Sequence, residues 1–231
     1  MKNWIYINSN RIIDILCLSA ALDHAKQKWS LVRTTGVTQY LLHHPNVNEV
    51  GFPTPDDNVV IINLNEIGGF YDKVEYILNQ INEEVPEDLG NFEVHCNVEH
   101  PNLLERIRNE KYSILLLTMS GERPMDLFFI DETCRLISNS GFKFASLGEL
   151  IIPCIRGTAD FRGLLNEVEI LASLEHAPFV MTNDPSITEF CRAKKIKVFH
   201  LQQSETTLSC NNLPMTSPNH LVNMILKHYH N

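Results

Sequence analysis

The sequence is poor in positively charged residues, and none of its cysteines lie close to one another in the chain. Its 231 residues include 19 Lys and Arg against 28 Asp and Glu, a net charge of −9. Broad binding to nucleic acid or to an anionic membrane needs clustered Lys and Arg, so this balance argues against both. The six cysteines form no C-x-x-C pair, and several lie in apolar segments. This favours reduced thiols packed as small hydrophobic side chains over a disulfide framework.

Long apolar runs and several common catalytic signatures are also missing. No stretch reaches ~18 uninterrupted apolar residues, and polar residues interrupt the N-terminal apolar run, so we expect neither a membrane span nor a signal peptide. The chain has no G-x-S-x-G, and Gly157 is not followed by G-K-S or G-K-T, which argues against a Ser-His-Asp hydrolase and a Walker loop. The ten histidines lack the spacing of a helical metal site, so we expect none. These features predict a soluble, cytoplasmic protein.

Short apolar runs alternate with helical patterns along most of the chain. The near-continuous apolar run at 112–118 is typical of a strand covered on both faces, and residues 71–85 show an amphipathic helical pattern. Such alternation predicts an α/β protein with parallel sheets and right-handed crossovers. We expect a first unit over 1–97, a linker segment over 98–110, a second unit over 111–216 and a final helix over 217–231.

A few segments carry weaker local patterns. SLVRTT (30–35), EVHCNV (93–98) and IIPCIRG (151–157) are interpreted as strands. Residues 203–212, which are rich in Ser, Thr and Asn, are interpreted as a loop.

Polar clusters follow several of the expected strands. Ligands of open α/β sheets bind at the carboxyl ends of the strands, which makes these clusters candidate binding segments. In one of them, Asn183-Asp184-Pro185-Ser186 ends a buried strand and opens a helix. Two interpretations of this segment are possible. Asp184 caps the helix, or the free N–H groups of the helix bind a phosphate. The clusters lie at 118–121, 148–149, 156–158 and 182–186.

The order of these pieces resembles a known family. The C-terminal half runs ILLLTMSGERPMDLF, FKFASLGE, RGLLNEVEILASLEHAPFVMTND and ITEFCRAKKIKVFHL, and the N-terminal half contains IYINSNRIIDILCLSAALDHAKQKW and HHPNVNEV. This order is similar to that of the ADP-heptose:lipopolysaccharide heptosyltransferases of glycosyltransferase family 9. The resemblance implies a GT-B-like architecture, in which two Rossmann-like parallel-sheet domains face each other across a cleft. The first, shortened domain would lie on the acceptor side, and the second would bind the nucleotide-sugar.

The resemblance also implies an activity. A sugar, such as heptose, would move from a nucleotide-diphosphate donor, such as ADP-heptose, to a hydroxyl of a glycan or lipid-linked glycan, without a metal or other cofactor. A lipid-linked acceptor would bring the protein to a membrane surface without a transmembrane segment.

Individual residues match the functional positions of the family. Asp14 matches the proposed base for the acceptor hydroxyl, and Glu149 matches the ribose-binding glutamate. Without such roles, Asp14 would be a surface residue in the first turn of a helix and Glu149 a solvated turn residue. Arg123 and Arg156 are candidate phosphate contacts, although an Arg near a strand end often only pairs with a carboxylate. The other donor-binding matches are Thr118, Ser120, Gly121, Asn183, Asp184, Pro185, Ser186 and Ile187.

The sequence departs from the family pattern near these positions. The glycines of the family's G-x-G-D loop are absent from residues 10–14, Ser186 replaces a glycine, and Glu189 stands where the family has a His. The basic residue of the donor loop has no clear match either. These changes remove close backbone approach and charge stabilisation of the leaving diphosphate. Two alternatives therefore stay open: a non-catalytic relative that binds a nucleotide, glycan or protein partner, and a different α/β enzyme acting on a phosphorylated small molecule.

Overall fold

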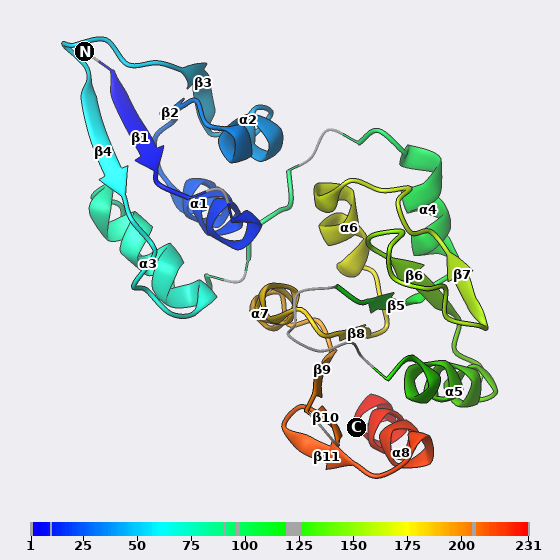
Figure 1. Cartoon of the computed structure of the whole chain (residues 1–231). Helices are drawn as coiled ribbons and strands as arrows, with labels where there is room; N and C mark the ends of the chain where they lie inside the picture. The colour runs from blue at the N-terminus through cyan, green and yellow to red at the C-terminus, as the bar shows by residue number, and fades with distance from the viewer. Residues whose placement is uncertain are drawn as a thin grey trace. The chain divides into compact units, whose positions relative to one another are not determined.

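The chain forms two compact units, Met1–Glu99 (unit 1) and His100–Asn231 (unit 2). The computed structural model describes residues 2–9, 11–89, 91–95, 98–118, 126–204 and 207–230. Each unit is an α/β sheet with its own helices (Figure 1). No helix in these described ranges is long and apolar enough to cross a membrane.

Unit 1 contains a four-stranded parallel sheet in the order β3-β2-β1-β4. From β1 the chain passes through α1 to β2 and through α2 to β3, and it then returns to place β4 on the other side of β1. The point where the strand order reverses, the switch point, therefore lies between β1 and β4. The elements are β1 (Asn3–Ile7), α1 (Ile12–His24), β2 (Trp29–Val32), α2 (Thr35–Leu41), β3 (Val47–Gly51), β4 (Asn58–Ile62) and α3 (Phe70–Gln80).

Helix α1 is the centre of unit 1. It packs against both α2 and α3, and every residue from 13 to 22 is buried (Figure 1). A helix that is buried all round is almost wholly apolar, because each polar group inside must find a partner. Asp14 is the one charged residue in that buried stretch. The sequence thus places a carboxylate inside the core of unit 1.

Unit 2 contains a seven-stranded sheet in the order β11-β10-β9-β8-β5-β6-β7. The chain moves from β5 through α5 to β6 and β7, and α6 then carries it back to β8 on the other side of β5. A second switch point therefore lies between β5 and β8. The strands are β5 (Ser113–Leu116), β6 (Phe144–Leu147), β7 (Thr158–Asp160), β8 (Val180–Thr182), β9 (Val198–Gln203), β10 (Leu208–Cys210) and β11 (Leu213–Met215).

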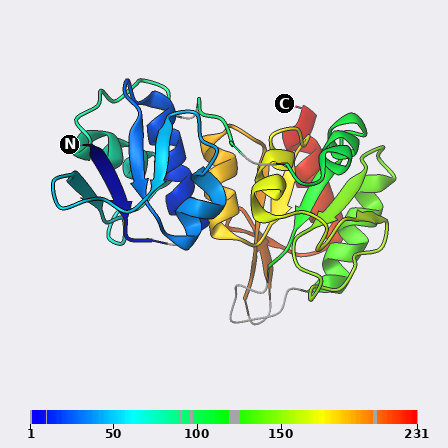
Figure 2. The same ribbon diagram turned by 90° about the horizontal axis from the view of Figure 1, so that it is seen from above.

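The helices of unit 2 cover an extensive apolar cluster. Helices α5 and α8 lie side by side (Figure 2), and the cluster includes Leu115, Ile137, Phe179 and Leu221. Helix α4 lies within the segment that the sequence analysis assigned to a linker, and it packs against α6. The helices are α4 (Pro101–Asn109), α5 (Leu127–Ser138), α6 (Glu167–Leu174), α7 (Pro185–Ala193) and α8 (Pro218–His230).

Several local predictions are wrong. Residues 93–95 form no strand, and 96–97 lie outside the described residues. The segment 151–157 is a loop that leads into β7, although Ile152 and Ile155 are buried, which explains its strand-like apolar pattern. Strand β2 ends at Val32 rather than at residue 35.

The expected loop at 203–212 contains most of an antiparallel hairpin. Strand β9 extends to Gln203, and β10 and β11 pair antiparallel across Asn211-Asn212, whose φ angles are 49° and 65°. A two-residue hairpin turn with both φ angles positive favours Asn at these positions. The Asn-Asn pair was therefore the sequence signal for the hairpin.

Candidate functional site

The side chain of Asn183 bonds to the backbone of Thr118 and so ties together the strands at the switch point of unit 2. The Thr118 N–H donates to Asn183 Oδ1 at 2.8 Å, and Asn183 Nδ2 donates to the Thr118 carbonyl at 2.8 Å. Thr118 follows β5 and Asn183 follows β8. Crevices at such points are where open α/β sheets bind ligands. The structure therefore brings these two predicted donor-site residues together at the expected edge.

The helix that opens beside them is capped by its own sequence. Asp184 Oδ1 accepts the N–H groups of Ser186 at 2.7 Å and Ile187 at 3.2 Å, and Pro185, which has no N–H, occupies the first helical position. Asp184 therefore caps this helix, as the first of the two interpretations in the sequence analysis predicts. A phosphate bound here would share these two N–H groups with the Asp184 carboxylate or displace it.

The other predicted donor-site residues are placed differently. Glu149 follows Gly148 at the carboxyl end of β6 and is exposed. Arg156 precedes β7. It lies at the amino-terminal edge of the sheet, because the first residue of β7, Thr158, pairs with Phe144, the first residue of the parallel strand β6. The structure therefore does not bring Arg156 to the carboxyl edge that carries Thr118 and Asn183. Three predicted residues, Ser120, Gly121 and Arg123, lie outside the described residues.

A buried histidine of β9 lies against the first turn of α7. His200 is 9% exposed, and its Nδ1 lies 2.8 Å from Thr188 Oγ1, which donates to the Asp184 carbonyl at 2.9 Å. Burial lowers the pKa of His200, the nearby Arg192 lowers it further, and Asp184 opposes both effects. The imidazole is therefore neutral near pH 7. The sequence signal was a polar residue within the buried strand VFHL.

Asp14 lies at the switch point of unit 1 with both carboxylate oxygens engaged. Lys73 Nζ lies 2.9 Å from Oδ1, and Ser9 Oγ donates to Oδ2 at 2.6 Å. Asp14 is 1% exposed and Lys73 4%. The alternative of a surface aspartate is therefore wrong. Sequence reasoning missed Lys73, although a lysine between Phe70 and Val74 on the buried stripe of α3 was the signal.

A pocket of about 570 Å³ lies at the carboxyl ends of β2 and β3. The Arg33 guanidinium has no hydrogen bond or ion pair with any other described residue, and Phe52 is 73% exposed. An unpaired cation, hydroxyl groups and an open aromatic ring are groups that bind a polar ligand with an apolar face. The sequence analysis placed the first part of this pocket inside a strand. The lining residues are Arg33, Thr34, Thr35, Thr38 and Phe52.

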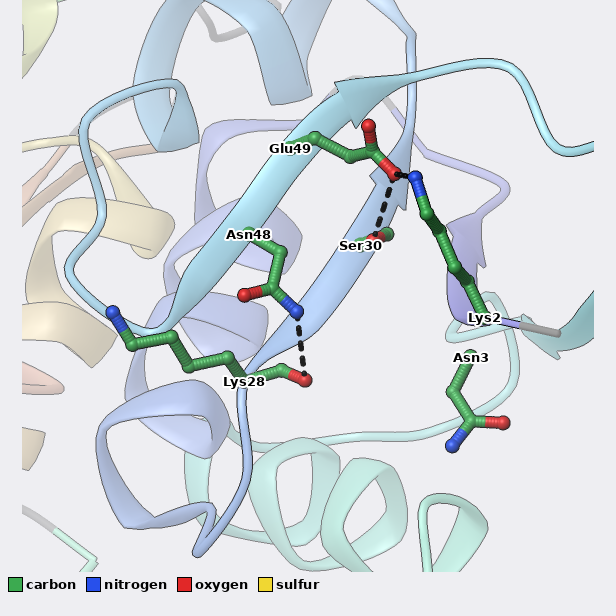
Figure 3. A pocket seen from close by; sticks show the side chains of 6 residues that line it. All are labelled: Lys2, Asn3, Lys28, Ser30, Asn48 and Glu49. Atoms are coloured by element: carbon green, nitrogen blue, oxygen red, sulfur yellow. Dashed lines mark hydrogen bonds and ion pairs between the residues drawn. The ribbon is translucent and has the colours of Figure 1, made fainter.

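A second pocket, of about 310 Å³, lies toward the amino ends of the same sheet (Figure 3). Its charges are partly paired, because Lys2 Nζ lies 2.5 Å from Glu49 Oε1, while Asn48 donates to the Lys28 carbonyl. Figure 3 shows the Lys2 and Glu49 side chains pointing toward each other. Ligands of open sheets bind at the opposite edge, so we assign no ligand to this pocket.

Asp23, His44 and His95 bring three ligand-type atoms within 4.8 Å of one another. Asp23 Oδ1 lies 3.3 Å from His44 Nε2 and 2.9 Å from His95 Nε2. Burial works to raise the pKa of Asp23, but its hydrogen bonds outweigh burial and the pKa lies below the usual value. His44 Nδ1 accepts the Asn46 N–H, while its Nε2 faces the Ser19 carbonyl at 3.2 Å. These contacts put the His44 proton on Nε2, so the cluster suits hydrogen bonding better than metal binding.

Neither a protein-family model nor a curated protein sequence matches the chain, whereas several solved structures do. The E. coli heptosyltransferase WaaC with ADP has a TM-score of 0.65 at 11% identity, covering 99% of this chain and 98% of WaaC. A glycosyl transferase family 9 protein from Veillonella parvula has a TM-score of 0.61 at 9% identity, covering 85% and 80%. The dodecameric iron-containing heptosyltransferase TibC from E. coli has a TM-score of 0.55 at 12% identity, covering 99% and 76%.

These similarities concern the fold. The chain has the GT-B-like α/β fold of the heptosyltransferases, which confirms the predicted fold class and the resemblance to glycosyltransferase family 9 at the structural level. Only about a tenth of the residues are identical between this chain and these structures, so its function has to be argued from its own sites.

Proposed function

We propose that this protein is a glycosyltransferase that moves a sugar from a nucleotide-diphosphate donor to a glycan hydroxyl. One observation carries the proposal: polar residues gather at both switch points of a fold shared with heptosyltransferases along nearly the whole chain. The donor is assigned to unit 2 and the acceptor to unit 1. Heptose is the sugar named for the structural neighbours, so ADP-heptose is the first donor to test.

The donor side would use the carboxyl edge of unit 2. The Thr118–Asn183 pair holds the ends of β5 and β8 together, and the first turn of α7 provides the positive end of a helix dipole for the diphosphate. The exposed carboxylate of Glu149 can accept hydrogen bonds from ribose hydroxyls. This assignment gives separate groups to the phosphates and to the nucleoside.

The acceptor side would use the pocket around Arg33. The exposed Phe52 ring offers an apolar surface on which the C–H face of a sugar can stack, and the threonine hydroxyls offer hydrogen bonds. Arg33 supplies a positive charge without a partner among the described residues. We propose a glycan or lipid-linked glycan as the ligand of this pocket.

We propose that the reaction needs no bound metal. The one described cluster of three ligand-type side chains, around Asp23, has its atoms engaged with one another. It lies at the end of α1, away from the switch point that holds Asp14 near the start of that helix. Stabilisation of the leaving diphosphate would then come from helix dipoles and cations.

Two observations favour a non-catalytic relative as the second candidate. The Asp184 carboxylate already occupies the first N–H groups of α7, and Asp14 is buried with both oxygens engaged. Such a protein would keep the fold and bind a nucleotide, a glycan or a protein partner without transfer.

Thermal melting of the full chain with ADP, UDP, GDP, CMP and their sugars, together with donor hydrolysis, separates these candidates. A ligand at 100 times its dissociation constant adds about 2.7 kcal/mol, which for a chain of this size raises the melting temperature by roughly 5–10 °C. We expect a shift for one nucleotide and slow hydrolysis of its sugar. A shift without hydrolysis or transfer would support the non-catalytic relative, and no shift with any ligand would overturn donor binding itself.

A further inference from the structure

The burial of Asp14 is a physical obstacle to its acting as a base. A general base must come within hydrogen-bond reach of the proton that it removes, directly or through one intermediate group. Asp14 is 1% exposed, Lys73 holds one of its oxygens, and Ser9 holds the other. An acceptor hydroxyl therefore has no direct path to the carboxylate in this arrangement.

Ser9 is a partly exposed residue that is bonded directly to the buried Asp14 carboxylate. It lies two residues beyond the end of β1, at the switch point, and is half-buried. Its Oγ accepts the Arg11 N–H at 3.1 Å and donates its own proton to Asp14 Oδ2 at 2.6 Å. A hydroxyl oxygen has two lone pairs, and Arg11 uses one. The second lone pair can accept a hydrogen bond from a ligand.

We propose that Ser9 is the residue that contacts the acceptor hydroxyl, and that it relays the proton of that hydroxyl to Asp14. The inference rests on the proposed transferase function and adds a catalytic residue to it. As the acceptor oxygen forms its bond to the anomeric carbon, the bond from that carbon to the diphosphate oxygen breaks and the diphosphate leaves with the electron pair. The acceptor proton passes to Ser9 Oγ while the Ser9 proton passes to Asp14 Oδ2. Ser9 ends as a neutral hydroxyl and Asp14 as a carboxylic acid.

Lys73 fits this arrangement as a positioning residue. Its ammonium compensates the buried carboxylate and holds Oδ1, which leaves Oδ2 aimed at Ser9. The acceptor hydroxyl becomes strongly acidic once its bond to carbon forms. The proton transfer is therefore feasible at a late stage of bond formation.

The test compares sugar transfer by the wild-type chain with transfer by Ser9→Ala, Ser9→Thr and Ser30→Ala. Ser30 is a control in the same unit, because its hydroxyl contacts Glu49 at the amino edge of the sheet. We expect Ser9→Ala to lower kcat by ~10²–10⁴-fold, the usual range for a lost acid–base group. Ser9→Thr, which keeps the hydroxyl, should recover most of the rate, and Ser30→Ala should match the wild type. The melting shift with the donor nucleotide should stay unchanged in all three variants, which shows that they fold.

A proton inventory in mixtures of light and heavy water gives a readout that a structural role would not move. Two protons in flight give a curved dependence of kcat in the wild type, and the curvature should vanish in Ser9→Ala. An active wild type with a fully active Ser9→Ala would overturn the relay and leave the transferase function standing. A folded wild type that binds a donor and transfers sugar to no acceptor would overturn the proposed function, and the relay with it.

Discussion

At the scale of single residues, the most unusual feature is an ion pair buried between helices α1 and α3. Asp14 and Lys73 are both almost fully buried, and 59 residues separate them in the sequence. Removing two charges from water is costly, and their attraction offsets that cost only when the geometry is good and the remaining atoms are bonded. At 2.9 Å, with Ser9 on the second oxygen, the pair meets this condition.

Removing only the cation of this pair should therefore destabilise the protein strongly. We expect Lys73→Met to lower the free energy of unfolding by about 3–5 kcal/mol, because the Asp14 carboxylate would stay buried without a positive charge beside it. Urea denaturation of the full chain measures this loss.

Two variants control that measurement. Lys26→Met removes a cation from the exposed pair with Glu84 and should leave stability unchanged. The double variant Asp14→Asn/Lys73→Met removes both charges and should recover most of the loss. A Lys73→Met protein as stable as the wild type would contradict the buried pair.

The neutral His200 imidazole should make stability depend on pH. Its folded pKa lies below the ordinary value of 6.5, because burial and Arg192 outweigh the Asp184 carboxylate. The unfolded chain then binds more protons than the native state in mildly acid solution. Stability from this residue is complete above about pH 6.5 and is lost as the pH falls toward the folded pKa.

The variant His200→Asn isolates this effect. Its amide can replace Nδ1 as donor to Thr188 but cannot titrate. We expect the loss of stability between about pH 7 and 5, followed by urea denaturation, to be smaller in this variant. Equal pH profiles for both proteins would show that the His200 pKa is not depressed.

At the scale of elements, the N-terminus of α7 has one observed role, capping by Asp184, and one proposed role, phosphate binding, and both would use the same N–H groups. As a cap, the Asp184 carboxylate satisfies Ser186 and Ile187. As a phosphate site, the same terminus would bring a second negative charge against that carboxylate. A neutral cap that keeps the acceptor oxygen separates the two roles.

We expect Asp184→Asn to strengthen the binding of the donor nucleotide several-fold, because it removes the repulsion. Asn caps helices about as well as Asp, so the melting temperature without ligand should stay nearly unchanged. Calorimetric titration with the nucleotide found in the melting panel measures the affinity. The control Glu132→Gln removes the same charge from the middle of α5 and should have no effect. Weaker binding in Asp184→Asn would mean that the carboxylate itself contacts the donor.

The errors in predicting elements share a physical cause. The segment 151–157 has strand-like apolar residues because Ile152 and Ile155 fill the core from a loop. An apolar pattern in the sequence indicates that residues are buried, but buried residues can also belong to a loop. The hairpin around Asn211 was hidden for the opposite reason, since β10 and β11 are short and polar residues surround them.

At the scale of the whole molecule, each unit places its candidate chemistry at its own switch point. Asp14 follows β1, which separates β2 from β4, and Thr118 follows β5, which separates β6 from β8. At these points the connections leave to opposite sides, so the ends of neighbouring strands are left open to a ligand. Under the proposed function, a chain of net charge −9 binds a diphosphate, so positive groups near the site must outweigh the negative field of the whole chain. On the donor side, the N-terminus of α7 is suited to that task.

The sequence by itself determined the alternation of strands and helices, the α/β class and the strand ends where Thr118, Asn183 and Asp184 stand. Those features depend on local periodicity and on residues close together in the chain. Only the tertiary structure decided that Lys73 neutralises Asp14, that Asn183 bonds to Thr118 65 residues away, and that Arg156 lies away from the donor edge. These contacts depend on the order of strands in each sheet, because strand order decides which side chains, distant in sequence, meet at one edge.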